Sequence, residues 1–261
     1  MVQQQFIQGK KTFLLYPHSV IREEMLDTLL MAGFETYALF NEEKARNVLV
    51  KYPGSTMFIN IDEYLEEKEW ESYIRSIQED PRTKSSRLGI ISYNHDQQLM
   101  EKYLINLSIP CGYIQLKLGL KESTRIMIKV LQANEAREGP CKFRVSCEQE
   151  KSSTFNYQGY WGIYRGKLLE LSASGIAVRF EKTGYFYPGT VLQGVQLKLH
   201  GKIIITDMTI VGQRRDDEHV YILLFQNLSF DHRFAVFRYM KHCMEKKIEG
   251  ALSTTTAEVQ L

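Results

Sequence analysis

The sequence predicts two domains of different class, an α/β domain with a parallel sheet and then an antiparallel β domain with a closing helix. Short apolar runs alternate with segments of helical period up to residue 136, whereas residues 143–226 contain only strand-like runs. Gly139-Pro140 lies between the two regions and stops a helix, so it marks the boundary. We therefore predict domains at 1–136 and 143–249, a linker at 137–142 and a disordered tail at 250–261.

Five apolar runs in the first region have the length of buried strands, and each is followed by a segment of helical period. The expected strands are Thr12–Tyr16, Thr36–Phe40, Thr56–Ile61, Leu88–Ser92 and Gly112–Leu116. The expected helices are 22–32, Glu42–Lys51, Glu63–Gln78, Gln97–Asn106 and Lys121–Ala136, with Ser19 and Asn41 as N-cap candidates for the first two. Such alternation predicts a parallel sheet with flanking helices, and five units fit the flavodoxin-like strand order.

This first domain resembles the receiver domain of two-component response regulators. In that family an Asp ends the third strand, a Ser or Thr the fourth and a Lys the fifth; the matching positions here are Asp62 (or Asn60), Ser92 and Lys117. The family also needs an acidic pair after the first strand to hold Mg²⁺, and this chain has Tyr16-Pro17-His18 there. Without two carboxylates the ion has too few hard oxygen ligands. We therefore expect a receiver-like fold without phosphotransfer, in which Asp62 faces the N-terminus of the next helix.

The second region reads as an antiparallel barrel or sandwich, because short strands follow one another across short turns. The expected strands are Phe143–Glu148, Gln158–Tyr164, Lys167–Leu171, Ile176–Phe180, Gly194–His200, Lys202–Gln213 and His219–Gln226, with breaks that include Arg165-Gly166 and Ser172–Gly175. One helix follows, with Ser229 or Asp231 as its cap. Its apolar stripe is Phe230, Phe234, Phe237, Met240, Met244 and Ile248.

The stretch from Leu168 to Phe180 organises this second region. Two strand-like runs in it are joined by Ser172-Ala173-Ser174-Gly175. Small hydroxyl residues followed by glycine allow a sharp turn, and they leave backbone N–H groups and hydroxyls that suit an anionic partner. The alternative is an ordinary turn between two strands.

The second region resembles PilZ domains, the bacterial receptor modules for cyclic di-GMP, over roughly residues 139–248. The family signature has two arginines four residues apart at the domain entrance and Asp/Asn-x-Ser-x-x-Gly on the barrel. Arg144 matches the second arginine, and Pro140 stands where the first belongs. Glu170, Ser172 and Gly175 match the barrel signature, with Glu in place of Asp or Asn. The resemblance implies a PilZ-like antiparallel β-barrel and a cyclic di-GMP site formed by these four residues.

Cyclic di-GMP carries two phosphates and two guanines, and a guanidinium can donate a bidentate pair to a phosphate or to guanine O6 and N7. Loss of one arginine costs roughly 2–4 kcal/mol by analogy with charge-assisted pairs, or ~30- to 1,000-fold in affinity. Arg137 and Lys142 lie near the entrance and are candidates to replace the missing arginine, as are Arg165 and Arg179. Alternation along the entrance strand places Lys142 on the same face as Arg144.

The composition argues against several other functions. Hydrophobic residues make up 44% of the chain and charged residues 25%, and the formal net charge of +2 gives no general attraction to nucleic acid or membranes. The sequence has no GxGxxG, GxxxxGK or GxSxG motif, no apolar run near the ~20 residues of a membrane helix, and no CxxC pair. We expect a cytoplasmic protein that is not an enzyme, has no metal or cofactor, and does not bind nucleic acid or insert into membranes.

Two functions remain open. In the first, the chain is a signalling adaptor that binds cyclic di-GMP at the entrance strand and the Ser-Gly turn and relays binding by reorienting its domains or a protein partner. In the second, it is a scaffold that has lost the ligand and acts through protein–protein contacts. Pro140 favours the scaffold, whereas Arg137 and Lys142 favour the receptor.

Overall fold

A computed structural model describes residues 10–116, 119–135, 144–148, 150, 153–182 and 186–258. The chain divides into two compact units, and the second unit spans Lys142–Lys247. The segment 137–142, which the sequence assigns to a linker, lies outside the described residues.

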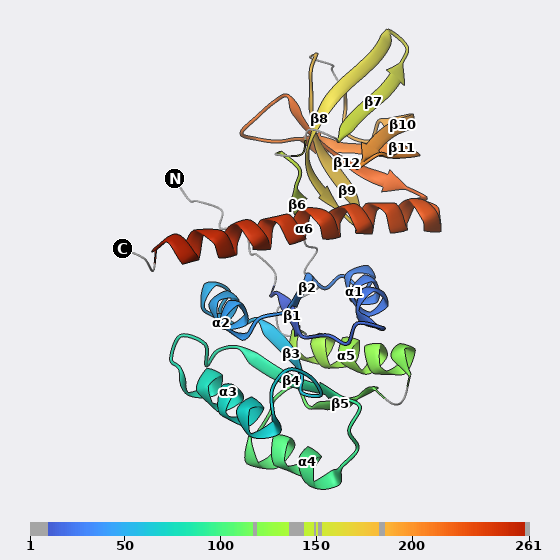
Figure 1. The fold of residues 1–261 in the computed structure, drawn as a ribbon. Coiled ribbons are helices and arrows are strands. Elements are labelled where there is room, and N and C mark those ends of the chain that lie inside the picture. Colours follow the sequence, from blue (N-terminus) through green and yellow to red (C-terminus); the bar gives the residue numbers. More distant parts are fainter. Residues whose placement is uncertain are drawn as a thin grey trace. The chain divides into compact units, whose positions relative to one another are not determined.

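The first unit contains a parallel five-stranded sheet in the order β2-β1-β3-β4-β5 (Figure 1). The strands are β1 (Thr12–Leu15), β2 (Thr36–Leu39), β3 (Thr56–Asn60), β4 (Arg87–Ser92) and β5 (Tyr113–Gln115). Every residue of the central strands β1 and β3 is buried, as expected for a sheet covered on both faces. The strand order is the flavodoxin-like one, so the α/β fold predicted for this half is confirmed.

Helices connect these strands. They are α1 (Arg22–Met31), α2 (Glu42–Lys51), α3 (Glu67–Glu79), α4 (Gln97–Glu101), which continues into the π-helical turn η1 (Lys102–Asn106), and α5 (Leu120–Glu135). Their buried side chains, among them Leu29, Trp70 and Met127, fill the space against the sheet.

One helix cap and one helix start differ from the prediction. Asn41 caps α2 as predicted, because its side chain accepts the Lys44 N–H at 2.8 Å. Ser19 does not cap α1, which has Ile21 at its N-cap and no side-chain cap bond there. Helix α3 begins four residues later than predicted because Glu66 and Glu69 form a reciprocal capping box at its start.

The second unit is an antiparallel barrel with one further strand. Its strands are β6 (Arg144–Ser146), β7 (Thr154–Gly159), β8 (Gly162–Ser172), β9 (Gly175–Phe180), β10 (Val191–Leu199), β11 (Lys202–Gln213) and β12 (Val220–Gln226). They follow the order β6-β8-β7-β10-β11-β12-β9, and pairing between β8 and β9 closes the six described strands other than β6 into a ring. The antiparallel barrel predicted for this half is therefore confirmed.

The first hairpin of the barrel was predicted at the wrong place. The turn lies at Tyr160-Trp161, where Gly159 pairs with Gly162, and β8 runs unbroken through the predicted break at Arg165-Gly166. Gly166 is needed inside the strand because a Cβ there would lie 2.7 Å from a methyl carbon of Val178. In the sequence, the glycine at 166 looks like a turn residue, whereas in the structure it permits close packing between strands.

The barrel interior is filled by aliphatic side chains and an aromatic cluster. Phe155, Val195 and Leu223 are fully buried. The ring of Phe180 contacts those of Phe155, Phe186 and Tyr221 at centroid distances of 5.0–5.4 Å.

Helix α6 (Phe230–Glu258) follows the barrel. Of the predicted apolar stripe, Phe237, Met240, Met244 and Ile248 are buried, whereas Phe230 is 71% exposed. The helix also includes residues 250–258, for which the sequence predicts disorder. Among the described residues, none of the helices combines the length and apolarity required to cross a bilayer.

The difference between the two predicted caps can be measured. We expect Asn41→Ala to lower the free energy of unfolding by about 1 kcal/mol, because a Lys44 N–H loses its acceptor. Ser19→Ala should change it by less than about 0.5 kcal/mol, since Ser19 is exposed and caps no helix. Urea denaturation of the two variants tests this, and an equal loss in both would contradict the assignment of the caps.

Candidate functional site

The short strand β6 positions Arg144. It runs antiparallel to the end of β8, with Arg144 opposite Ser172, Val145 opposite Leu171 and Ser146 opposite Glu170. Val145 is buried, whereas Arg144 and Ser146 are exposed, so alternation places the Arg144 side chain on the outer face of the barrel. The backbone of Arg144 therefore lies opposite the first residue of the Ser172–Gly175 turn, and its guanidinium reaches toward Glu170.

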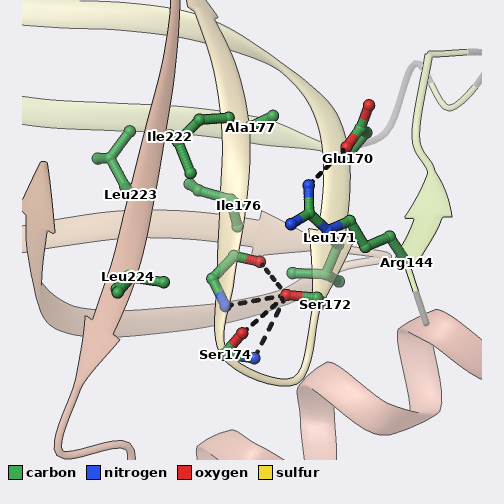
Figure 2. Close-up of a pocket in the computed structure, with 11 residues that line it drawn as sticks. Arg144, Glu170, Leu171, Ser172, Ser174, Ile176, Ala177, Ile222, Leu223 and Leu224 are labelled. Atoms are coloured by element: carbon green, nitrogen blue, oxygen red, sulfur yellow. Dashed lines mark hydrogen bonds and ion pairs between the residues drawn. The ribbon is translucent and has the colours of Figure 1, made fainter. Parts of the chain in front are cut away.

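Glu170 lies between two arginines on this face. Its Oε2 is 3.6 Å from Nη1 of Arg144, and its Oε1 accepts a hydrogen bond from Nη2 of Arg214 (Figure 2 shows the Arg144 contact). The bond to Glu170 raises the pKa of the Arg214 guanidinium above its usual value. Oε2 is buried and has no hydrogen-bond partner among the described residues, since 3.6 Å is too long for one. The three side chains together carry one net positive charge.

The two arginines differ in exposure. The Arg144 side chain is 52% exposed, and that of Arg214 is 25% exposed. Arg214 is therefore the more enclosed partner of Glu170, and Arg144 is the more exposed one. Sequence reasoning missed Arg214, because it lies 44 residues from Glu170 and was assigned to a break between strands.

The Ser172 hydroxyl forms hydrogen bonds within its own turn (Figure 2). It accepts the N–H groups of Gly175 at 3.1 Å and Ser174 at 3.3 Å, and it donates to the Gly175 carbonyl oxygen at 3.1 Å. A hydroxyl has one hydrogen and two lone pairs, so these bonds satisfy it. The turn also accepts the Phe225 N–H at the Ser174 carbonyl, 3.0 Å away. The sequence predicts that the Ser172 hydroxyl is available to a ligand. In the structure this hydroxyl instead stabilises the turn.

Gly175 is required by strand packing. A Cβ at this position would lie 2.1 Å from the carbonyl oxygen of Leu223, and Gly175 pairs with Leu224 in β12. No side chain fits in that space without displacing backbone. The glycine allows β9 to approach β12, and through this it holds the turn beside Arg144.

A shallow recess lies at this corner. Arg144, Glu170, Ser172, Ser174 and Gly175 supply its polar edge, and its apolar side includes Ala177, Ile222 and Leu224 (Figure 2). Its free volume of about 30 Å³ has room for one or two waters. A larger ligand would lie on the open face of the barrel and contact the recess with one edge.

The other predicted cations are placed differently. Arg137 and Lys142 lie outside the described residues, as does Pro140. Arg179 pairs with Asp217, with 2.6 Å between Nη2 and Oδ2. Arg165 is exposed on β8, in the half of the strand that pairs with β7.

The receiver-like positions of the first unit form a hydrogen-bonded corner. Asp62 accepts the Ser92 hydroxyl at 2.5 Å and the Tyr93 N–H at 2.7 Å, and Asn60 donates to the Tyr16 carbonyl oxygen at 2.9 Å. The expectation that Asp62 faces the start of α3 is thus wrong, because its carboxylate is held at the end of β4. Lys117 lies outside the described residues.

No family model matches the sequence, and no curated protein sequence matches it. Solved structures match parts of the chain. The PilZ domain of YcgR from Escherichia coli, determined with c-di-GMP, is 15% identical over 42% of this chain and 95% of that one, with a TM-score of 0.36. The MrkH–c-di-GMP complex from K. pneumonia is 16% identical, covering 45% of this chain and 56% of that one, with a TM-score of 0.34. The Bacillus subtilis inhibitor of motility MotI/DgrA is 17% identical, over 41% of this chain and 50% of that one, with a TM-score of 0.33. The matched region thus spans about half the length of MrkH and of MotI.

The packing role of Gly175 gives a stability prediction. We expect Gly175→Ala to cost about 1–3 kcal/mol of unfolding free energy, because the added methyl meets the Leu223 carbonyl and cannot be relieved by a side-chain rotation. Gly212→Ala is the matched control, since a Cβ on that barrel glycine meets nothing within 4 Å. Thermal and urea unfolding measure both variants, and equal stability of the two would contradict the close approach of β9 and β12.

Proposed function

We propose that this chain is a non-catalytic signalling adaptor whose barrel binds cyclic di-GMP at the corner formed by Arg144 and the Ser172–Gly175 turn. One observation carries the proposal: Arg144 lies directly opposite Ser172 on the outer face and remains half exposed. The site is an open surface, and the ligand would meet it with a phosphate and the edge of one guanine.

The energies favour exchange of the internal ion pair for a ligand phosphate. The Arg144–Glu170 pair is long at 3.6 Å and half exposed on the arginine side, so we assign it the contribution of a surface pair, about 0.2–1 kcal/mol. A hydrogen bond between ionised groups, as a bidentate phosphate contact would be, contributes about 1.5–3 kcal/mol. Arg144 can therefore leave Glu170 for a phosphate with a net gain.

Glu170 would then have a second role. Its Oε2 is a buried acceptor without a hydrogen-bond partner among the described residues. The Watson–Crick edge of guanine carries two N–H donors, which fit a carboxylate. With its Oε1 bonded to Arg214, Oε2 is the oxygen left to accept one of these donors, and Glu170 is one of the residues that line the recess.

The site needs a second cation for the second phosphate. Arg137 and Lys142 stay the candidates from the entrance segment, and Arg214 adds a positive charge from the loop before β12. Because Arg144 directly follows the segment that joins the units, ligand binding there would restrict that segment. We propose this restriction as the relay to a protein partner.

A second function, a scaffold without ligand, is favoured by other observations. The Ser172 hydroxyl is already satisfied within the turn, and Glu170 already has two cationic neighbours. In addition, the tip of the β7–β8 hairpin exposes 92% of Tyr160 and 86% of Trp161. Exposed aromatic side chains of this kind are typical of protein-binding surfaces.

Calorimetry with cyclic di-GMP separates these functions. We expect the full chain to release heat with one saturable site, and Arg144→Ala to bind roughly 30- to 1,000-fold more weakly because a phosphate loses its guanidinium. Arg125→Ala is the control, since Arg125 is also an exposed arginine with a nearby carboxylate, Glu122. Absence of heat with the wild type would favour the scaffold. Equal affinity of the wild type and Arg144→Ala would remove the site assignment.

Arg214 gives a second test. Arg214→Ala should weaken cyclic di-GMP binding about tenfold, because Glu170 loses a hydrogen bond between ionised groups and then holds Arg144 more strongly. Arg215→Ala, at the neighbouring exposed position, should leave the affinity unchanged. Titrations of both variants, with unfolding curves alongside, show whether Arg214 acts on the ligand or on stability alone. Unchanged affinity in Arg214→Ala would contradict its role in the site.

A further inference from the structure

Three metal-ligating side chains converge in the barrel unit, away from the Arg144 corner. Glu150 precedes β7, His200 lies in the turn between β10 and β11, and His242 lies on α6. One ligand atom from each lies within 4.8 Å of the other two. We propose that Glu150, His200 and His242 bind a divalent transition metal ion, with zinc the best fit.

His242 shows an unexplained buried nitrogen. Its Nε2 is shielded from solvent and has no hydrogen-bond partner among the described residues. A buried polar atom without a partner costs roughly 1–3 kcal/mol, and a bound ion is one of its ordinary explanations. The ring of His200 lies with its centroid 4.4 Å from that of His242, so two imidazoles meet at this point.

His200 is held in place by a turn that suits other residues better. It has φ +47° and the next residue, Gly201, has φ +86°, between paired residues Leu199 and Lys202. Such a two-residue hairpin turn favours Asn-Gly, and non-glycine residues are uncommon in the left-handed region, where Asn, Asp and His are the enriched ones. Unfavourable backbone conformations of this kind gather at functional sites.

Glu150 supplies an ionised oxygen ligand. Its side chain is 13% exposed, and Nζ of Lys246 lies 2.7 Å from its Oε1. Lys246 also repels a cation, but its side chain is 53% exposed and can turn into solvent.

Two imidazoles and one carboxylate are a common set of zinc ligands, with a fourth position left to water. Bonds of about 2.0–2.1 Å at tetrahedral angles place ligand atoms roughly 3.3 Å apart. The observed upper limit of 4.8 Å therefore requires only small side-chain rotations. His200 and His242 also line a hollow of about 410 Å³, so the fourth position would be open to solvent and the ion exchangeable.

Binding would join three separate parts of the barrel unit. An ion held by these residues links the β10–β11 turn and the segment before β7 to α6. This cluster is not visible in the sequence, because its members are separated by 50 and 42 residues and match no metal-binding spacing.

Zinc titration of the metal-stripped full chain tests the proposal. We expect one zinc ion per chain and a rise in melting temperature of at least about 5 °C with zinc at a hundred times its Kd. His200→Ala or His242→Ala should weaken binding by more than about a hundredfold, beyond the roughly 10- to 100-fold loss when an outer partner of a metal site is changed. His219→Ala, an exposed histidine elsewhere on the barrel, is the control and should bind as the wild type does.

Two further measurements test the site even if the histidine variants fail to fold. Lys246→Met should bind zinc several-fold more tightly because a competing positive charge is removed. Cobalt should give a visible spectrum without thiolate charge transfer, although Cys147 and Cys243 are free and buried in the same unit. The proposal is overturned if zinc does not bind saturably, if binding survives both histidine substitutions, or if the cobalt spectrum shows thiolate ligands.

Discussion

The pairing of β6 with the end of β8 is the constraint on which the candidate ligand site depends. Among the described residues this strand consists of Arg144, Val145 and Ser146, and the Cys147 N–H continues it with a 2.7 Å bond to the Leu169 carbonyl oxygen. Because side chains alternate along a strand, a slip of one residue would bury the guanidinium and expose the valine. Burial of Val145 and Cys147 fixes the register, and the register places Arg144 opposite the turn.

An irregularity in β8 completes the site. The register against β9 shifts between Leu168 and Glu170, so that Leu168 faces Val178 inside the barrel while Glu170 pairs with Ala177 on the outer face. In a regular strand these two residues would point to the same side. The extra residue, Leu169, is buried with Ala177 and Val220 in a small cluster. The bulge is therefore what turns the carboxylate toward Arg144 and Arg214.

The sequence predicts those parts of the fold that follow from the local pattern of apolar and polar residues. The buried strands of the first unit and the alternation around Val145 are visible as apolar periodicity, and Lys202–Gln213 was predicted with its observed bounds. What it does not show are features set by distant contacts. The sequence around Gly166 indicates a turn, and only the structure shows that the methyl of Val178 leaves no room for a Cβ there. Likewise, no residue near Glu170 in the sequence indicates that Arg214 is its partner. The convergence of His200 and His242 likewise appears only once α6 lies against the β10–β11 turn.

Both candidate sites use an internal ion pair in the same way. Glu170 is held by Arg214 and approached by Arg144, and Glu150 is held by Lys246. In each case a carboxylate is paired with a cationic side chain, and one of its cationic neighbours, Arg144 or Lys246, is about half exposed. A half-exposed partner adds little stability, so it can be displaced at small cost. The same weakness that makes these pairs poor contributors to the fold would leave the groups they touch available to a phosphate in the proposed ligand site and to a metal ion in the proposed metal site.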